Sequence, residues 1–325
     1  MTAPIWISER DVSLTLGQSI VLLRRAMMRQ AAGNATNMEK THAQWADGNM
    51  HAIGAVFSDC GILGVKSWAH TAKGATPLEL LWDAENGKLL AVIEAFAMGQ
   101  LRTAGMAGLA TDVLADTSAD VLAICGTGKQ ALAQVAAVKA VRPLRRVHVY
   151  GRDAARRAAF VARVEQLGLA AESFDDVRKA VANTPVVTLI TRAAEPFLGP
   201  DMPARGAHIN AMGAITPERK EFAPQLLDRC AVVAVDSVGQ ARTLSCELMA
   251  HWGNDFARPS LKELSALVAQ KQHRPSGADL TLFKSLGVGI ADLALAEEIY
   301  RLARERGVGF ALPEPAPRPL TFSDR

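Results

Sequence analysis

The segment VLAICGTGKQALAQ, at residues 121–134, constrains the fold of this chain more than any other. A run of branched apolar residues meets Gly126 and Gly128, and an alanine-rich stretch typical of a helix follows at once. This order of strand, glycine turn and helix start is the dinucleotide-binding fingerprint in its G-x-G-x-x-A form, with Ala131 in the last position. Small residues also form ordinary strand-to-helix turns, but the flanks here favour a cofactor site. The predicted dinucleotide-binding residues of the turn are Gly126, Thr127, Gly128, Lys129 and Gln130.

The size and composition are those of an ordinary globular enzyme. The 325 residues suggest about two domains at ~150 residues each. Apolar residues make up 49% of the chain, and the net charge of +3 comes from scattered Lys and Arg residues, which argues against nucleic-acid binding. The four cysteines lack metal-ligand spacing and predict free thiols in a reducing compartment, with no metal site. Charged residues interrupt the start and no apolar run reaches ~18 residues, so we expect a cytoplasmic protein without signal peptide or membrane association.

The chain has two regions with different patterns of apolar residues. Between residues 37 and 94, short apolar runs are separated by turns, and Asn86-Gly87 between two such runs indicates a hairpin, so we expect a mostly antiparallel sheet. From about residue 118, apolar strands alternate with helices, which predicts a parallel, doubly wound sheet. The predicted strands of that sheet are ADVLAIC, RVHVYG, PVVTLIT, GAHINAMGA and CAVVAVDS. The predicted long helix at 288–307 follows them and is expected to return to the N-terminal part.

The end of the second strand bears on which dinucleotide binds. NAD-binding units usually place an acidic residue there for the ribose diol, but this chain has Gly151 and Arg152. A guanidinium suits a 2′-phosphate, so the sequence favours NADPH, with NADH still possible. Arg156 and Arg157 follow one turn later. The alternative to phosphate binding is that these arginines form a solvated helix face and that Asp153 serves a ribose after a small shift of register.

Five segments together resemble the ornithine cyclodeaminase/μ-crystallin family over nearly the whole chain. They are GVKSW (64–68), GQLRTAGMAGLAT (99–111), GTGKQA (126–131), GAHINAMGA (206–214) and LFKSLGVGIADLALA (282–296). The resemblance implies an α/β fold in which a Rossmann-type doubly wound parallel sheet is inserted into an α+β substrate-binding and dimerisation domain. The expected boundaries are 1–112 plus 297–325 for the substrate domain and 113–296 for the dinucleotide domain. It also implies a homodimer.

The resemblance carries site residues with it. Lys66 matches the lysine of the family's G-x-K segment and Arg102 the arginine of its R-T-A/G segment, which implies that both hold the substrate carboxylate beside the nicotinamide. An α-imino or α-amino acid carries a carboxylate, and arginine can bind it through two parallel hydrogen bonds. The matches also place Thr191, Met212 and Ser285 around the nicotinamide half of the cofactor.

Departures from the family pattern bear on the reaction. Cyclodeaminases carry an acidic residue shortly after the INAxG strand, where this chain has Ile215, which cannot exchange a proton. The cyclodeaminase arginine aligns with Lys40, which is expected to assist in binding the carboxylate. Its glutamate aligns with His51, which is expected to titrate near neutrality and to relay a proton, or else to form a structural hydrogen bond.

The resulting prediction is an NAD(P)H-dependent reductase of a small cyclic imino acid, of the type that converts Δ1-pyrroline-2-carboxylate to proline. Lys66 and Arg102 are its predicted catalytic residues, with Lys40 and His51 also at the substrate, and Lys66 or His51 supplying the proton. Two alternatives stay open: an ornithine cyclodeaminase or alanine-type amino-acid dehydrogenase, and a non-catalytic NADPH-binding protein of the crystallin kind.

Overall fold

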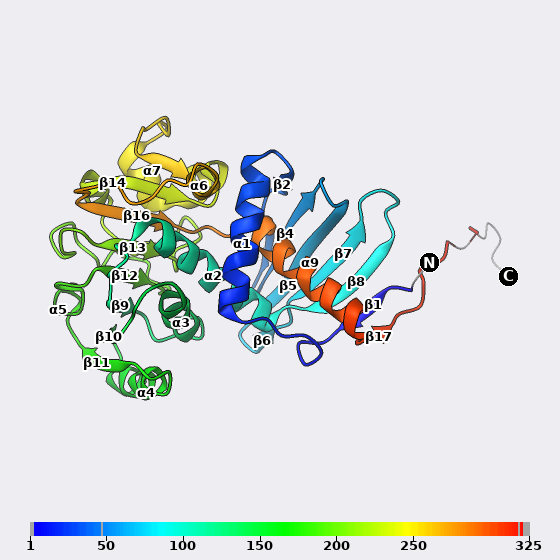
Figure 1. Cartoon of the computed structure of the whole chain (residues 1–325), viewed down its shortest axis with the longest axis horizontal. Helices are drawn as coiled ribbons and strands as arrows, with labels where there is room; N and C mark the ends of the chain where they lie inside the picture. The colour runs from blue at the N-terminus through cyan, green and yellow to red at the C-terminus, as the bar shows by residue number, and fades with distance from the viewer. Residues whose placement is uncertain (1–2, 47, 318, 321–325) are drawn as a thin grey trace.

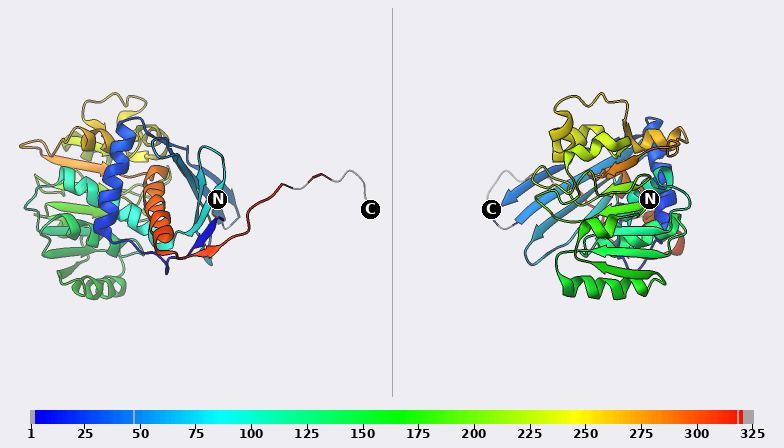
Figure 2. Two further views of the ribbon diagram at one scale, coloured as in Figure 1. Left: turned by 45° about the vertical axis from the view of Figure 1, so that its right-hand side comes forward. Right: turned by 90° about the vertical axis from the view of Figure 1, so that its left-hand side faces the viewer.

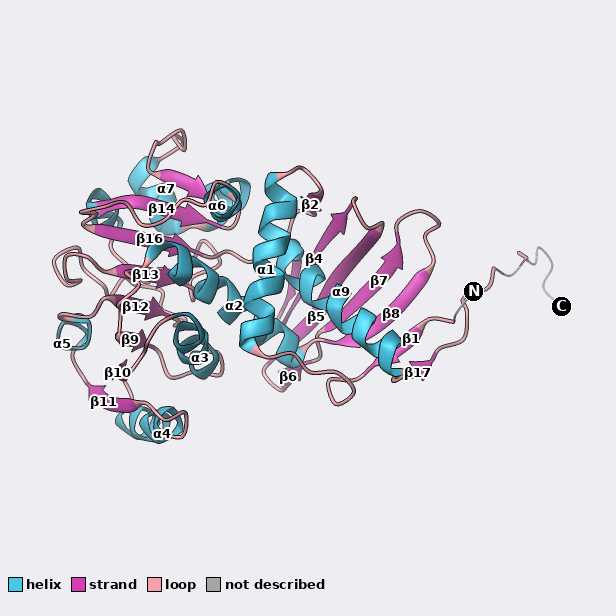
Figure 3. Ribbon diagram, in the orientation of Figure 1, coloured by secondary structure: helices cyan, strands magenta, loops and turns pink. Residues whose placement is uncertain are grey.

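Two β-sheets meet along a bundle of long helices in the computed structural model, which describes residues 3–46, 48–317 and 319–320 (Figure 1). Figure 3 shows the strands of one sheet on the left and those of the other on the right. The helices at the junction are α1 (Leu16–Ala31), α2 (Phe96–Leu114) and α9 (Gly289–Arg306), which pack against one another. Residues far apart in the sequence are thereby brought to one place.

The first sheet has eight strands, all of them parallel. In spatial order these are β11 (Ala170–Phe174), β10 (Arg146–Tyr150), β9 (Val121–Cys125), β12 (Val186–Leu189), β13 (His208–Ala211), β16 (Leu280–Lys284), β14 (Cys230–Val235) and β15 (Leu261–Glu263). The helical segments of this part are α3 (Ala131–Val141), α4 (Ala154–Glu165), α5 (Val177–Val181), η1 (Pro224–Arg229), α6 (Val238–Leu244), α7 (Cys246–Trp252) and α8 (Leu264–Ala269). Strand order reverses at β9, between β10 and β12, which makes this the switch point where ligands bind.

The predicted doubly wound parallel sheet is confirmed, because separate buried cores cover its two faces. All five predicted strands are present, and each is trimmed by one or more residues at its ends. Strands β11, β15 and β16 were missed as separate strands. Strand β16 lies inside the LFKSLGVGIADLALA segment, whose later residues dominate its apolar pattern as helix α9.

The second sheet is mostly antiparallel, as predicted, and only β1 and β8 run parallel. Its spatial order is β17 (Phe310–Ala311), β1 (Ile5–Ile7), β8 (Leu89–Glu94), β7 (Leu78–Asp83), β5 (Ile62–Thr71), β4 (Gly48–Phe57) and β2 (Ala35–Asn37), with β3 (Thr41–Trp45) on β4 and β6 (Gly74–Ala75) on β5. The predicted Asn86-Gly87 hairpin joins β7 to β8, and Gly87 has a φ of +70°.

Helix α9 crosses one face of the antiparallel sheet and carries a buried apolar side toward it (Figure 2). Its first residue, Gly289, lies so close to β4 that a side chain there would collide with the carbonyl oxygen of Gly54. The helix ends at Gly307, whose φ of +65° is the left-handed conformation common after a helix. The predicted return of this helix to the N-terminal part is confirmed by its contacts with β4 and β5.

The domain boundaries at 112/113 and 296/297 stay a prediction, and residues 318 and 321–325 of the last segment lie outside the described residues. Helix α9 runs without a break across the second boundary. No described helix is both long and apolar enough to cross a lipid bilayer. Within the described ranges, no three His, Cys, Asp or Glu side chains converge as a metal site would require. The four cysteines are free; Cys125 and Cys230 are buried, but Cys60 is exposed.

Candidate active site

The glycine turn after β9 has the geometry that a bound dinucleotide needs. Gly126 has a φ of +122°, its N–H donates to the carbonyl of Tyr150 at 2.9 Å, and a Cβ there would collide with the carbonyl oxygen of Ile190. Only glycine fits this position without strain. A Cβ on Gly128, in contrast, would find no atom within 4 Å, so the backbone at Gly128 borders open space.

The start of α3 has backbone donors to offer. Gln130 occupies the N-cap position without capping the helix by its side chain. In the part of the chain that the structure describes, the amides of Gly128 and Lys129 donate no hydrogen bond. The side-chain oxygen of Gln130 is buried and also has no partner. Free amides at a helix start bind phosphate well, so the predicted turn fits a pyrophosphate.

Beyond β10, the guanidinium of Arg152 is exposed. Asp153 caps α4, because its carboxylate accepts the N–H of Arg156 at 2.9 Å. Arg157 is partly buried and donates to the carbonyl of Gly151 at 2.5 Å, so it shapes the end of β10. Arg152 and Arg156 are both exposed and available to a phosphate, Arg152 being the nearer to the end of β10, and the carboxylate of Asp153 is already used in capping.

The residues expected at the nicotinamide lie along one edge of the parallel sheet. Thr191 follows β12, Met212 follows β13 and Ser285 follows β16. The N–H of Met212 bonds to the carbonyl of Leu189 at 2.9 Å, and the N–H of Ser285 to that of Ala211 at 3.1 Å. This is the carboxyl edge, where ligands of open α/β sheets bind. The structure therefore brings these three positions to the same edge as the glycine turn.

A buried carboxylate that sequence reasoning missed holds the loops after β12 and β13 together. Glu221 is fully buried and accepts four hydrogen bonds. Its donors are the N–H of Thr191 at 2.6 Å, the hydroxyl of Thr191 at 2.8 Å, the N–H of Gly213 at 2.7 Å and the N–H of Ala214 at 3.1 Å. Burial raises the pKa of Glu221, and the charge of buried Lys284 opposes that shift.

A second buried carboxylate, which the sequence analysis also missed, holds the loop after β16 by hydrogen bonds. Asp236 follows β14 and accepts the hydroxyl of Ser285 at 2.9 Å, the N–H of Leu286 at 2.9 and 3.0 Å, and the N–H of Gly287 at 2.8 Å. Burial raises the pKa of Asp236, whereas the backbone donors and the positive charge of Arg102 lower it. Asp236 thus connects the loop of Ser285 to the predicted substrate-binding arginine.

Lys66 and Arg102 meet at a third buried carboxylate, Asp292 on α9. The ammonium of Lys66 on β5 forms an ion pair with Asp292, and the Nε of Arg102 on α2 lies 3.2 Å from the same oxygen. The exposed fractions of the side chains are 4% for Lys66, 15% for Arg102 and 1% for Asp292. The sequence predicted the two cations as a pair but gave no carboxylate partner for them.

The far end of Arg102 faces the dinucleotide part of the site. Its Nη1 lies 3.1 Å from the position that a Cβ on Gly287 would take, and Gly287 has a φ of +85°. Within the described ranges, neither Nη group of Arg102 has a protein acceptor. Two free guanidinium donors therefore lie beside Gly287, two residues after Ser285. A pair of parallel donors of this kind is the arrangement that binds a carboxylate.

Glu79 on β7 was not predicted from the sequence. It lies directly opposite Lys66 on the neighbouring strand, it is 1% exposed, and its Oε2 has no hydrogen-bond partner. Burial and the charge of Asp292 raise the pKa of Glu79 well above its usual range, against the opposing charges of Lys66 and Arg102. The raised pKa favours the uncharged form of Glu79, which then offsets less of the positive charge of Arg102, and this suits an anionic substrate.

His51 does not titrate as the sequence suggested. Its ring stacks on Trp68 with centroids 4.8 Å apart, and burial and the charge of Lys40 lower its pKa to about 4. The expectation that His51 titrates near neutrality is therefore wrong, because an uncharged ring is favoured beside a lysine. At pH 7 the His51 ring is neutral and is not an acid that could protonate the substrate. Its stacking on Trp68 gives it a structural role beside the site.

Lys40 lies near both cations. Burial, followed by the charge of Arg102, lowers the pKa of Lys40 to about 8, and the charge of Lys66 lowers it further while Asp236 and Asp292 oppose the shift. Lys40 is consequently charged at pH 7 and loses that charge at mildly alkaline pH.

This gives a pH prediction. Because Lys40 is protonated below about pH 8, its attraction for a substrate carboxylate is present there and is lost as the pH rises through that value. We expect KM for an anionic substrate to rise about fivefold between pH 7 and 9.5, and Lys40→Met to lack this rise. Lys73→Met, in an exposed turn, is the matched control. An identical pH profile for Lys40→Met and the unaltered enzyme would contradict the assignment.

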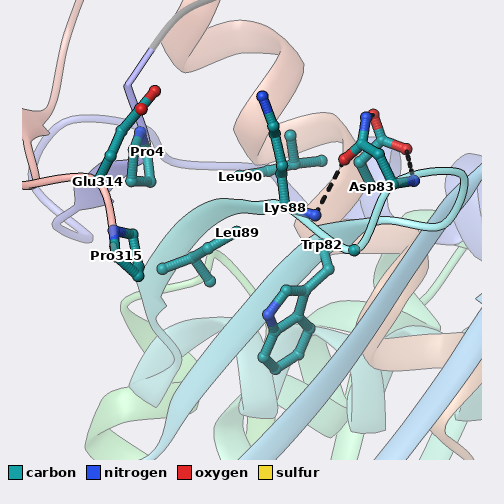
Figure 4. Close-up of a pocket in the computed structure, with 10 residues that line it drawn as sticks. Pro4, Trp82, Asp83, Lys88, Leu89, Leu90, Glu314 and Pro315 are labelled. Carbon is teal, nitrogen blue, oxygen red and sulfur yellow. Dashed lines mark hydrogen bonds between the residues drawn. The ribbon is translucent and has the colours of Figure 1, made fainter. Parts of the chain in front are cut away.

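A separate hollow lies at the β7–β8 turn, away from these clusters (Figure 4). It has a volume of about 510 Å³ and is lined by Trp82, Asp83, Lys88, Leu89 and Leu90, with Pro4, Glu314 and Pro315 from the chain ends. None of the predicted site residues lines it.

The fold and the site together define a dinucleotide-dependent oxidoreductase of the Rossmann type. A glycine turn at the switch point offers phosphate donors, and a paired arginine and lysine face the same edge of the sheet. The chain belongs to the ornithine cyclodeaminase/mu-crystallin family, whose model matches residues 10–307, and this confirms the family predicted from the sequence.

Several relatives are similar over most of the chain. A Δ1-pyrroline-2-carboxylate reductase from Bacillus cereus is 31% identical over 234 residues, covering 71% of this chain and 72% of the relative. The ketimine reductase mu-crystallin of Mus musculus is 32% identical over 222 residues, covering 68% and 67%. A Δ1-pyrroline-2-carboxylate reductase from Thermococcus litoralis, solved with NADH and L-proline, has the same fold, with a TM-score of 0.88, 24% identity and coverage of 95% and 100%.

Proposed function

We propose that this protein is an NAD(P)H-dependent reductase of a small cyclic imino acid, of the Δ1-pyrroline-2-carboxylate type. One observation carries the proposal: the two free Nη groups of Arg102 lie beside Gly287, at the edge of the sheet where the glycine turn would hold the dinucleotide. Relatives with reductase names at about 30% identity support the same reaction class.

The chain's own residues would bind and orient the substrate. Arg102 would hold the substrate carboxylate through its free Nη groups, while its Nε lies 3.2 Å from the carboxylate of Asp292 in an ion pair without a hydrogen bond. Lys66 and Lys40 would add positive charge on the same side. When bound, the dinucleotide supplies a hydride to the carbon of the C=N bond. These positions orient the imine without requiring a catalytic carboxylate, because a protonated iminium is already electrophilic.

The proton for the imine nitrogen would come from an ammonium group. Lys40 has a pKa of about 8 and is charged at pH 7. Burial, followed by the charge of Arg102, lowers the pKa of Lys66 against the opposing charge of Asp292, which makes the Lys66 ammonium a stronger acid. Of the two sources named from the sequence, Lys66 stays in the proposal. His51 does not, since its pKa of about 4 leaves it neutral.

The alternative reactions require groups that this site lacks or leaves unused. Ile215, at the position aligned with the cyclodeaminase acid, is 37% exposed and cannot exchange a proton. A cyclodeaminase reaction is therefore disfavoured. A binding protein without activity would not require a paired Lys66 and Arg102. Both side chains nevertheless form ion pairs with the buried carboxylate of Asp292.

An assay with paired substrates tests the proposal. The protein is given a dinucleotide and a panel of cyclic imines, linear imines formed from pyruvate and ammonia, and L-ornithine. We expect stoichiometric oxidation of the reduced dinucleotide with a cyclic imino acid. Ammonia released from ornithine without net cofactor change would instead show a cyclodeaminase, preference for the linear imine an alanine-type dehydrogenase, and binding without turnover a crystallin-like protein.

We also propose that NADPH is preferred to NADH, because Arg152 is exposed beside the end of β10 and Asp153 is used in capping. Arg152→Ala is expected to weaken NADPH binding about tenfold and to leave NADH binding within about twofold, as a guanidinium–phosphate pair contributes about 1.5–3 kcal/mol. Titration calorimetry with both dinucleotides measures this, and Arg163→Ala, an exposed arginine in the last turn of α4, is the matched control. Equal loss of affinity for both would contradict the preference.

A homodimer is the second part of the proposal, and the antiparallel sheet suggests its surface. Val65, Leu80 and Val92 are paired across β5, β7 and β8, so they share one face. It is opposite to the face of Lys66, which α9 covers. These three apolar side chains are partly exposed, and Met50 and Val56 on β4 are 51% and 38% exposed. An uncovered apolar sheet face of this kind is typical of an interface.

Val65→Glu is expected to produce a monomer, because a charge at the centre of an apolar interface is costly to bury. Val21→Glu, on an exposed position of α1, introduces the same change away from this face and should leave the mass unchanged. Light scattering after size-exclusion chromatography measures both. A monomeric unaltered protein, or a dimeric Val65→Glu variant, would contradict the assignment of this face as the dimer interface.

The cytoplasmic location predicted from the sequence also stays a proposal, supported by the free thiols.

A further inference from the structure

Glu79 is a buried acid that faces Lys66 across two neighbouring strands. The two residues are directly opposite each other on β7 and β5, so their side chains leave the same face of the sheet. Opposite residues of an antiparallel pair have Cβ atoms about 4.5–5.5 Å apart, within reach of long side chains. Glu79 is 1% exposed, and its Oε2 is buried without a hydrogen-bond partner. A buried charge without such a partner is costly, so these surroundings favour a neutral carboxylic acid.

Close packing fixes the place of this carboxyl group. A Cβ on Gly64, two residues before Lys66 on β5, would lie 2.7 Å from Oε1 of Glu79 and 3.0 Å from a methyl group of Leu293 on α9. The carboxyl group of Glu79 therefore occupies space that a side chain at position 64 would fill. Its position beside Lys66 depends on the glycine there.

The charged groups that face Glu79 come from three elements: Lys66 from β5, Asp292 from α9 and Arg102 from α2. Burial, followed by the charge of Asp292, raises the pKa of Glu79 against the two cations. The same surroundings act in the opposite direction on Lys66, whose pKa burial and the charge of Arg102 lower, against Asp292 and Glu79. An unusually weak acid thus lies beside an unusually acidic ammonium group, and neighbouring groups of this kind exchange protons as a pair.

The hydrogen bonds within the cluster are incomplete. An ammonium group has three N–H donors, and within the described residues Lys66 makes one hydrogen bond, to Oδ1 of Asp292. The second oxygen of Asp292, Oδ2, is buried and has no partner, as is Oε2 of Glu79. Unused donors and acceptors therefore lie together in one buried cluster, which is what movement of a proton within it requires.

We propose that Glu79 is a positioning residue that acts through Lys66: it stores a proton and returns it to Lys66 after Lys66 has protonated the substrate. The inference rests on the proposed function, since it takes Lys66 as the proton donor. An N–H bond of Lys66 breaks as the N–H bond of the substrate forms. The O–H bond of Glu79 then breaks as the N–H bond of Lys66 is restored. Glu79 remains a carboxylate beside the Lys66 ammonium until water returns its proton.

Glu79→Gln tests the proposal, because an amide has the shape of the carboxylic acid but no proton to return. A structural role for a neutral Glu79 would leave the kinetics of this variant unchanged. We expect the steady-state kcat for a cyclic imino acid to fall about tenfold and KM to stay within about twofold. In rapid mixing, the first turnover should keep its rate within about twofold, because Lys66 still has its own proton, and only later turnovers should be slow.

Glu172→Gln removes an exposed acid of β11 and is the matched control, with the kinetics of the unaltered protein. Infrared spectroscopy adds a readout that does not depend on activity. At pH 7 the unaltered protein should show the C=O band of a protonated carboxyl group, and Glu79→Gln should lose part of that band. If Glu79→Gln does not fold, Glu79→Asp, which keeps the acid on a shorter side chain, should shift the band instead.

The outcomes separate this inference from the proposed function. An unchanged kcat for Glu79→Gln, or equal slowing of its first and later turnovers, overturns the inference and leaves the reductase proposal intact. Absence of a protonated carboxyl band from the unaltered protein, or a band that no Glu79 variant alters, also overturns it. If the unaltered protein reduces no cyclic imine, the proposed function fails and the relay to a substrate fails with it, while the infrared band still decides whether Glu79 holds a proton.

Discussion

Replacing Arg102 by alanine is expected to lower kcat/KM for a cyclic imino acid by about 10²–10³-fold, because removal of one partner from a buried charge pair costs about 2–5 kcal/mol. The Nη groups of Arg102 are the free donors beside Gly287, and no neighbouring cation has two such donors in one plane. We expect KM to rise and kcat to fall together, since the carboxylate is held in both the ground state and the transition state. Steady-state kinetics over a wide range of substrate concentration measure both.

Two further variants make the Arg102 result interpretable. Arg102→Lys keeps the charge but not the planar pair of donors, so it should recover only part of the activity. Arg306→Ala removes an exposed arginine near the end of α9 and should behave as the unaltered enzyme does. Nearly unchanged kinetics for Arg102→Ala, in a variant that remains folded, would refute the carboxylate-binding role.

The two glycines of the turn should respond oppositely to the same substitution. Gly126→Ala places a Cβ against the carbonyl of Ile190 at a φ of +122°, so we expect it to destabilise the fold by about 2–4 kcal/mol. Gly128→Ala meets no atom within 4 Å, so stability should change by less than about 1 kcal/mol. Its methyl group would fill the space that a pyrophosphate needs, and dinucleotide affinity should fall about 10–100-fold.

Chemical denaturation and titration calorimetry, made on the same preparations, separate these two effects. Gly168→Ala, at a positive φ in the turn after α4, is a control for backbone strain away from the dinucleotide. It should cost stability and leave affinity unchanged. If Gly128→Ala binds the dinucleotide as tightly as the unaltered protein does, the phosphates do not approach the backbone at this turn.

The parts of the fold that the sequence predicted are those with local signals. The glycine turn, the Asn86-Gly87 hairpin and the alternation of apolar strands with helices each depend on neighbouring residues, and each is present. Strand β16 was missed because its five residues were grouped with the long apolar helix that follows, although Gly277 and Gly287 mark turns on either side of it. Lys66 and Arg102 were found through the family resemblance, since neither lies in a pattern that shows its burial.

The carboxylates of the site could not be placed in the same way. Lys66 and Asp292 are 226 residues apart, and nothing local connects them. A signal was present, however, because Asp292 is the one charged residue in the stretch GIADLALA, and a charge within an apolar helix requires a partner. Glu79 gives a similar signal as the single charge within LELLW. The pKa of His51 depends on Lys40 and on burial, which only the folded chain determines.

The packing of α9 on the antiparallel sheet has a consequence for how the protein is made. The parallel sheet receives its last strand at Lys284, whereas Asp292 and β17 come later still. While the ribosome is still adding these residues, Lys66 and Glu79 face no helix, and the first strand of the chain lacks one of its neighbours. The dinucleotide-binding segment precedes α9 in synthesis, and Lys66 receives its ion-pair partner only from a helix made 226 residues later. A chain that stopped between Lys284 and Gly289 would contain every strand of the parallel sheet and would leave Lys66 without Asp292.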